Sequence, residues 1–251
     1  MIAVAAFAAL AAVAPSPCAD PALALRCPDL VMAPPSHMRL ARSPSGRSVL
    51  RMENRIVNVG VGPAELFGQR VSAVEMRARQ VIADASGRRH RFETGAELYY
   101  KSVPSRGGSY WKFKDAARFE LWAVDRSAHR TQLVRIGPKL DYCLRDLRRA
   151  RTGPTVRRHR LYPGCNQSAS KREVTLGTSV GWADAYPSRY PDNWIDVTGL
   201  SGCFAVVHRV DPLHHIFESN DANNVSSKIV RLPFKPGPQH CPRLPPPAAS
   251  A

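Results

Sequence analysis

The sequence predicts an all-β protein, an immunoglobulin-like β-sandwich with long decorated loops. Short stretches of alternating apolar and polar residues recur along the chain, and turn-forming residues separate them. A helical period of ordinary length is missing, with 141–149 as a candidate exception. With 251 residues, of which 44% are hydrophobic and 22% charged, the chain can build one large β domain or two small ones.

The segment 181–224 contains the clearest strands and organises the rest of the prediction. Trp194–Thr198 alternates in the manner of a half-buried strand, Gly199–Gly202 forms a turn, and Cys203–Asp211 is rich in Phe and Val. These three pieces predict a β-hairpin. An aromatic loop precedes it, and an acidic, amide-rich turn at 218–224 follows it.

The remaining strands come from the same alternation. The segment 49–61 reads as a strand of a kind common in immunoglobulin-like sandwiches. For 71–82 a short helix is an alternative, but the turn at 83–87 favours a strand. A glycine loop is expected at 106–109. Further strands are expected at His90–Phe92, Leu98–Tyr100, Tyr110–Phe113, Ala116–Val124, Gln132–Ile136, Val174–Val180 and Ile229–Leu232. Gly137–Cys143 is expected to turn into one more strand.

Both ends of the chain differ in composition from the domain between them. Residues 1–14 are almost purely apolar, too few to span a membrane, and typical of a secretory signal that ends at a small-residue site at 22–24. We therefore expect a signal peptide at 1–24, a β-sandwich domain at 25–233 and a Pro-rich disordered tail at 234–251. With no second apolar run of membrane length, the expected location is extracellular.

Six cysteines suit an oxidising compartment, where disulfides persist. Cleavage after Ala24 would remove Cys18 and leave an odd number. No two cysteines have the CxxC spacing of a structural zinc site, so disulfides are the better interpretation. Two pairings are favoured, although spacing does not fix them: Cys143 with Cys165, and Cys27 with either Cys241 or Cys203.

The chain carries a net charge of +16, most of it from arginine. A basic surface attracts nucleic acid, anionic membranes or the acidic polymers of a cell wall. Because the arginines are spread along the chain, a genome that favours arginine codons would also explain the charge. The expected partner is an extracellular protein or an anionic polymer, and nucleic acid is not expected.

Four segments, in order, carry a resemblance to a known family. They are Trp111–Leu121, Gly137–Asp146, Gly181–Thr198 and Glu218–Asn224. Together they make 27–233 similar to the lysyl oxidase family, in the form found in bacterial secreted proteins. The resemblance implies copper- and quinone-dependent oxidative deamination of protein lysines or other primary amines. It also implies that Lys139 and Tyr186 are the catalytic and cofactor-forming residues, which would join as lysine tyrosylquinone.

The copper positions of that family are occupied differently here. The family holds copper with an HxHxH run, in which alternation puts three imidazoles on one face of a strand. In this sequence the corresponding positions are Gly108, Tyr110 and Lys112. The eight histidines elsewhere do not restore the run: His214 and His215 are adjacent, and His208 could bind only alone. No metal ligand is therefore assigned, and the quinone is not expected to form.

Three functions follow from these observations. The first is a copper- and quinone-dependent amine oxidase, so the chain's status as an enzyme is open. The second is a non-catalytic secreted β-sandwich that binds an anionic cell-wall polymer or an extracellular protein. The third is a calcium-binding structural domain that uses Asp211, Glu218 and Asp221. No nucleophile motif supports a hydrolase.

Overall fold

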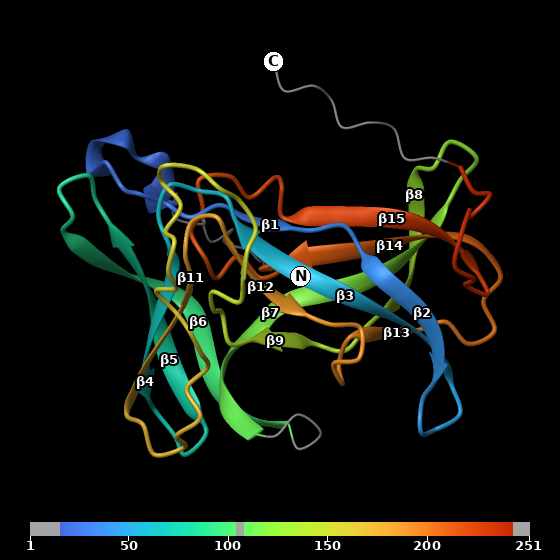
Figure 1. The fold of residues 1–251 in the computed structure, drawn as a ribbon, viewed down its shortest axis with the longest axis horizontal. Helices are drawn as coiled ribbons and strands as arrows, with labels where there is room; N and C mark the ends of the chain where they lie inside the picture. Colours follow the sequence, from blue (N-terminus) through green and yellow to red (C-terminus); the bar gives the residue numbers. More distant parts are fainter. Residues whose placement is uncertain (1–15, 104–107, 243–251) are drawn as a thin grey trace, which may run out of the picture.

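Two antiparallel sheets face one another in the structure, a computed structural model that describes residues 16–103 and 108–242 (Figure 1). Apart from two short 3-10 turns, η1 (Pro17–Ala19) and η2 (Pro21–Leu23), the regular structure of these residues is all β. The predicted all-β sandwich is confirmed.

The smaller sheet is built around β3 (Ser48–Asn58), which is buried along most of its length. The first half of β3 pairs with two strands and its second half with two others, all antiparallel. The other strands of this sheet are β1 (Leu30–Met32), β2 (Ser36–Arg42), β10 (Arg148–Arg149), β12 (Trp182–Tyr186) and β13 (Trp194–Asp196).

The larger sheet is built around β7 (Gly108–Val124), which pairs with four strands. The other strands are β4 (Ala64–Arg70), β5 (Glu75–Ala83), β6 (Arg89–Val103), β8 (Arg130–Ile136), β9 (Leu140–Tyr142), β11 (Glu173–Thr178), β14 (Gly202–Val210) and β15 (Val225–Leu232).

The main hydrophobic core draws on both sheets. Leu50, Met52 and Ile56 of β3 are fully buried in one cluster with Phe119 and Leu121 of β7. Burial of each such side chain contributes about 1.5–3 kcal/mol relative to its exposure. The inward-facing residues of two strands thus join the sheets into a sandwich.

The predicted hairpin at 194–211 is wrong, although both of its strands exist. β13 pairs with β3, whereas β14 pairs with β7 and β15 in the other sheet. The turn at 199–202, with positive φ at Gly199 and Gly202, leads the chain from one sheet to the other. Alternation identifies a strand, but it does not say which neighbour the strand pairs with.

Two other local predictions are also corrected. The strands expected at 110–113 and 116–124 are one long strand, β7, which passes through Asp115 in a left-handed conformation (φ 54°). The helix considered at 141–149 does not form, because this segment supplies β9 and β10 instead. In the glycine loop at 106–109, Arg106 and Gly107 lie outside the described residues.

All six cysteines are paired. Cys143–Cys165 is confirmed, with Cα atoms 5.4 Å apart. The pairing predicted for Cys27 is wrong, because Cys27 bonds Cys18 and Cys203 bonds Cys241. The expected loss of Cys18 by signal cleavage misled the prediction, because Cys18 itself, nine residues away, is the partner of Cys27.

The two ends of the chain are described only in part. Residues 1–15, which hold most of the predicted signal, and 243–251 of the predicted tail lie outside the described residues. Cleavage after Ala24 stays a prediction, and the Cys18–Cys27 bridge spans that position. No helix among residues 16–103 and 108–242 has the length and apolar character needed to cross a membrane.

Two of the three carboxylates considered for calcium, Asp211 and Glu218, bind groups of the chain itself, and the role predicted for Asp221 stays a prediction. Asp211 accepts from the backbone N–H groups of His215 and Ile216. Glu218 is buried and accepts from the Leu30 N–H and from the Asn224 side-chain amide. Burial raises the pKa of Glu218 from 4.5 to about 9, so this side chain is protonated in the folded state at neutral pH.

Glu218→Gln tests this buried carboxyl. Between about pH 5 and pH 9 the folded protein keeps a proton that the unfolded chain releases, so wild-type stability falls as pH rises. Glutamine has no such proton. The melting temperature of Glu218→Gln, measured relative to that of the wild type, should therefore increase from about pH 5 to about pH 9. The control Glu173→Gln, at an exposed site, should show no such increase. Parallel curves for Glu218→Gln and the wild type would contradict the assignment.

Candidate functional site

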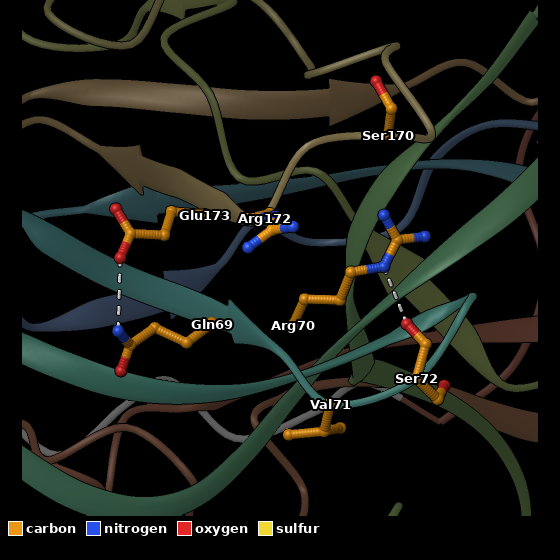
Figure 2. Close-up of a pocket in the computed structure, with 7 residues that line it drawn as sticks. All are labelled: Gln69, Arg70, Val71, Ser72, Ser170, Arg172 and Glu173. Atoms are coloured by element: carbon orange, nitrogen blue, oxygen red, sulfur yellow. Dashed lines mark hydrogen bonds between the residues drawn. The ribbon is translucent and has the colours of Figure 1, made fainter.

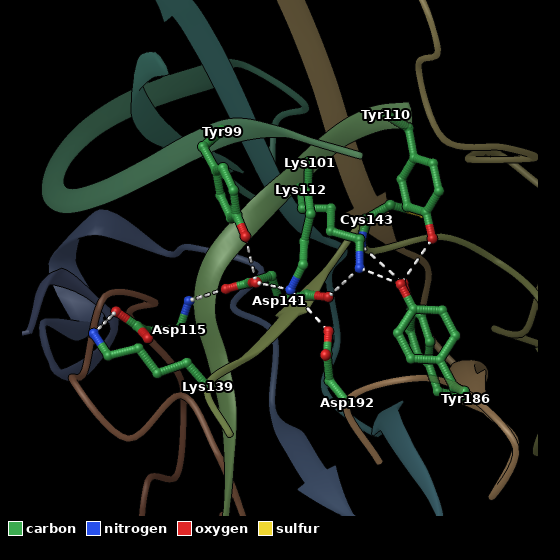
Figure 3. Close-up of polar contacts among 11 residues, drawn as sticks. Tyr99, Lys101, Tyr110, Lys112, Asp115, Lys139, Asp141, Cys143, Tyr186 and Asp192 are labelled. Atoms are coloured by element: carbon green, nitrogen blue, oxygen red, sulfur yellow. Dashed lines mark hydrogen bonds and ion pairs between the residues drawn. The ribbon is translucent and has the colours of Figure 1, made fainter. Parts of the chain in front are cut away.

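The amine of Lys112 is buried and lies close to the side chains of Tyr110 and Tyr186 (Figure 3). Lys112 Nζ donates to the Asp141 carbonyl oxygen at 2.9 Å and to the Tyr190 hydroxyl at 2.5 Å. It also lies 5.0, 5.4 and 4.8 Å from the ring centroids of Tyr110, Tyr186 and Tyr190, within the range of a cation–π interaction.

The strand geometry explains how this cluster forms. Because side chains alternate along β7, Tyr110 and Lys112 share one face, and Trp111 belongs to the other. Tyr186, at the end of β12, is buried, and its hydroxyl accepts from the Cys143 N–H at 3.1 Å. Its ring packs edge-to-face against those of Tyr142 and Tyr190, at 4.4 and 4.6 Å between centroids.

Asp141 joins the cluster to a second lysine. Its carboxylate accepts from the Tyr99 hydroxyl (2.8 Å), Lys101 Nζ (2.9 Å) and the Asp115 N–H (3.0 Å). Lys101 also donates to Asp192 at 2.8 Å. Burial alone would lower the pKa of Lys101, but its bonds to Asp192 and Asp141 outweigh burial and raise it. Lys101 is therefore firmly charged.

Lys112 differs from Lys101 in its hydrogen-bond acceptors. Lys101 donates to two carboxylates, whereas Lys112 donates to a carbonyl oxygen and a hydroxyl. Burial, helped by the nearby charge of Lys101, lowers the pKa of Lys112 from 10.5 to about 8. A measurable fraction of this amine is therefore neutral at slightly alkaline pH. Lysines of this kind are chemically versatile, so the environment of Lys112 marks it as a candidate functional group.

Asp184, on the same strand as Tyr186, is a fully buried acid. Neither carboxylate oxygen of Asp184 has a hydrogen-bond partner within the described residues. Its closest cation is Arg145, with Nε 3.8 Å from Oδ1. Burial raises the pKa of Asp184 to about 7, against the opposing charges of Arg145 and Lys112.

The structure does not bring the two predicted cofactor residues together. Lys139 Nζ bonds Asp115 at 3.0 Å, and its side chain is 79% exposed. Figure 3 shows Lys139 and Tyr186 on opposite sides of the cluster. Tyr186 lies in the cluster with Lys112, whose amine is 5.4 Å from its ring centroid, whereas Lys139 is bonded to Asp115 outside it. Their catalytic roles stay predictions.

The residues at the expected copper positions do not suit that ion. Lys112 presents a cationic amine where the resemblance calls for an imidazole, and tyrosines surround it. His208 is buried, stacks on Phe119 at 4.1 Å, and has its pKa lowered to about 3 by burial. Over residues 16–103 and 108–242 no three His, Cys, Asp or Glu side chains gather into a possible metal site.

Next to the cluster, a pocket of about 530 Å³ opens to the surface. The Cys143–Cys165 disulfide lies at its edge, through Cys165. Its walls include Tyr110, Arg145, Leu147, Gln167, Pro187 and Tyr190. This combination of aromatic rings, one cation and one amide is typical of sites that orient a polar ligand.

A second depression is a basic groove of about 650 Å³ on the smaller sheet. Its walls come from β2, β3, the hairpin between them, β13 and the loop 187–193. It contains five arginines and a tryptophan: Arg39, Arg42, Arg47, Arg51, Arg189 and Trp194.

A third depression, of about 660 Å³, lies where β4 meets β11 and has no comparable chemistry (Figure 2). Gln69 Nε2 donates to Glu173 at 3.2 Å, and Arg70 Nε donates to the Ser72 carbonyl oxygen at 2.8 Å. Gln69, Arg70 and Glu173 are therefore engaged within the chain itself.

Sequence reasoning missed Lys101, Asp141 and Arg145 as members of the site. The sequence did contain two signals for the tyrosine cluster itself. Tyr110 and Lys112 are two residues apart in a strand and so share one face, and the same holds for Asp184 and Tyr186.

The comparisons with known proteins add no identification, because neither a scan against models of known protein families nor a search of curated proteins found a match. The resemblance to lysyl oxidases thus stays a prediction.

Lys112→Met tests the buried amine. Between about pH 8 and pH 10.5 the folded state releases a proton that the unfolded chain keeps, so wild-type stability rises with pH. The stability of the variant relative to the wild type should therefore decline by up to about 3 kcal/mol across this window. Lys114→Met, at an exposed site on the same strand, is the matched control and should show no such trend. A constant difference for Lys112→Met would refute the lowered pKa.

Peptide mapping tests the predicted cofactor. From protein expressed with copper, we expect separate, unmodified peptides containing Lys139 and Tyr186, because Lys139 is held by Asp115 away from the tyrosine. A cross-linked peptide with quinone absorbance would contradict this expectation and restore the oxidase hypothesis.

Proposed function

We propose that the chain is a secreted, lysyl-oxidase-like protein that binds an anionic polymer of the cell wall instead of oxidising amines. The observation that carries this proposal is the basic groove. Charge from Arg39, Arg42, Arg47, Arg51 and Arg189 converges there, and no acidic residue lines it. An elongated, multiply charged partner suits such a surface better than a small neutral molecule.

The strand register supports a binding role for this charge. Arg39 lies directly opposite Arg51, which in turn lies opposite Trp194, so the three share one face of β2, β3 and β13. Like charges placed opposite one another destabilise a sheet. An anionic partner would relieve this repulsion.

Parts of the groove are held rigidly before any partner arrives. Arg51 Nε donates to the Ser188 carbonyl oxygen at 2.8 Å and fastens the loop 187–193 to β3. Arg47 lies 5.6 Å from the centre of the Trp194 ring and 3.5 Å from Asp196. Arg39 and Arg42 are exposed on β2 and remain accessible to a ligand. Preorganisation of this kind lowers the entropic cost of binding.

Amine oxidation has weaker support. The residues at the copper positions do not fit the ion, and Lys139 is paired with Asp115. The three disulfides are compatible with secretion. They suit a binding protein of the cell exterior as well as they suit an enzyme.

The proposal is tested by binding to polygalacturonate and to lipoteichoic acid, two anionic polymers with different charged groups. Affinity should fall steeply as salt rises from about 50 to about 300 mM, because bound counterions are released on association. Arg39→Glu/Arg42→Glu should weaken binding by about tenfold or more at constant salt, and the dependence on salt should become shallower.

The matched control is Arg77→Glu/Arg126→Glu, which changes the net charge equally at exposed sites outside the groove. It should weaken binding far less. Equal losses for both double variants would mean that overall charge, not the groove, attracts the polymer. Failure of both polymers to bind the wild type would remove the proposal.

A further inference from the structure

The pocket beside the tyrosine cluster is chemically different from the groove. Tyr110, Tyr186 and Tyr190 contribute aromatic surface and hydroxyl groups to its wall. Tyr110 is the most exposed of the three, and its hydroxyl bonds that of Tyr190 at 2.9 Å. A pyranose ring has the same dual character, with apolar faces and a polar edge. A pocket of about 530 Å³ has room for one such ring and falls within the size range of small-molecule sites.

Arg145 adds the charge selectivity. It is the cation among the pocket-lining residues, and its side chain is 31% exposed. Asp184 lies behind it and is fully buried, so the carboxylate orients the guanidinium without occupying the pocket. A guanidinium held in this way recognises a carboxylate through paired hydrogen bonds.

The pocket and the groove share one loop. Pro187 and Tyr190 line the pocket, whereas Arg189 and Pro191 of the same loop line the groove. A polymer lying in the groove could therefore continue over the loop into the pocket. A bare phosphodiester chain would leave the aromatic walls without an apolar partner, whereas an acidic sugar matches both the walls and Arg145.

We infer that this pocket binds one uronic acid residue of the polymer, with the sugar ring against the tyrosines and its carboxylate on Arg145. The inference rests on the proposed function for the identity of the polymer. It deepens that function by naming the acidic sugar. The Tyr110 hydroxyl and the Gln167 side chain are the polar groups of the lining that can meet the ring hydroxyls, because Lys112 and Tyr110 already engage the Tyr190 hydroxyl.

The test is calorimetric or NMR titration of the full chain with galacturonate, and with galactose as the neutral counterpart. Galacturonate should bind about tenfold or more tightly than galactose, since only the acid meets Arg145. Arg145→Gln should remove this preference, and Leu147→Trp should block both sugars by filling the pocket. Arg151→Gln, an exposed arginine outside the pocket, should change nothing.

If Arg145→Gln does not fold because Asp184 loses its cation, Leu147→Trp still decides the matter. Galacturonate binding that survives Leu147→Trp, or equal binding of galactose, overturns the inference. The groove variant Arg39→Glu/Arg42→Glu should keep its galacturonate binding.

The two proposals can fail separately. Polymer binding through the groove without galacturonate binding overturns the pocket assignment alone. Galacturonate binding without polymer binding overturns the proposed function and leaves the pocket as a sugar-acid site.

Discussion

Asp141 is the residue on which the interior polar network depends. Its carboxylate accepts from β6 through Tyr99 and Lys101, and from β7 through the Asp115 N–H, while its carbonyl oxygen accepts from Lys112. Buried polar groups are costly unless they are bonded, so a single side chain with this many partners constrains all the strands around it. Through Lys101 and Asp192 the same constraint extends to the loop 187–193. The loop 187–193, which lines both the pocket and the groove, is therefore linked through Lys101 to the Asp141 carboxylate.

Much of the fold was predictable because half-buried strands alternate. β3 and β11 follow directly from their apolar patterns, and so does the all-β class, whereas β8 is exposed along almost its whole length. Pairing was not predictable, since Trp194–Asp196 alternates equally well in either sheet. The left-handed Asp115 within β7 gave no signal at all, because aspartate also favours turns. Of the disulfides, only Cys143–Cys165 was predicted correctly.

The site was less predictable than the fold for a physical reason. Tyr186 and Lys112 could be selected from sequence, but Lys101 and Arg145 acquire significance only from partners far along the chain. Lys101 bonds Asp192, 91 residues away, and Arg145 faces Asp184. The resemblance selected Lys139 by its place in a segment, whereas the lysine near Tyr186 is Lys112, which a different strand supplies. Spacing in one segment says little about side chains that meet across two sheets.

The opposed arginines of β2 and β3 bring two positive charges to one face of the smaller sheet, where carbonyl oxygens of the loop 187–193 hold the Arg51 guanidinium. Arg39 and Arg51 face each other whether or not a ligand is present. Dissolved ions screen that repulsion and at the same time compete with a charged ligand. If the groove binds a polymer as proposed, salt would act on two properties of this protein with opposite sign: it would weaken the repulsion within the sheet and would also weaken the complex. The same pairing of like charges would then favour the bound state and disfavour the sheet alone.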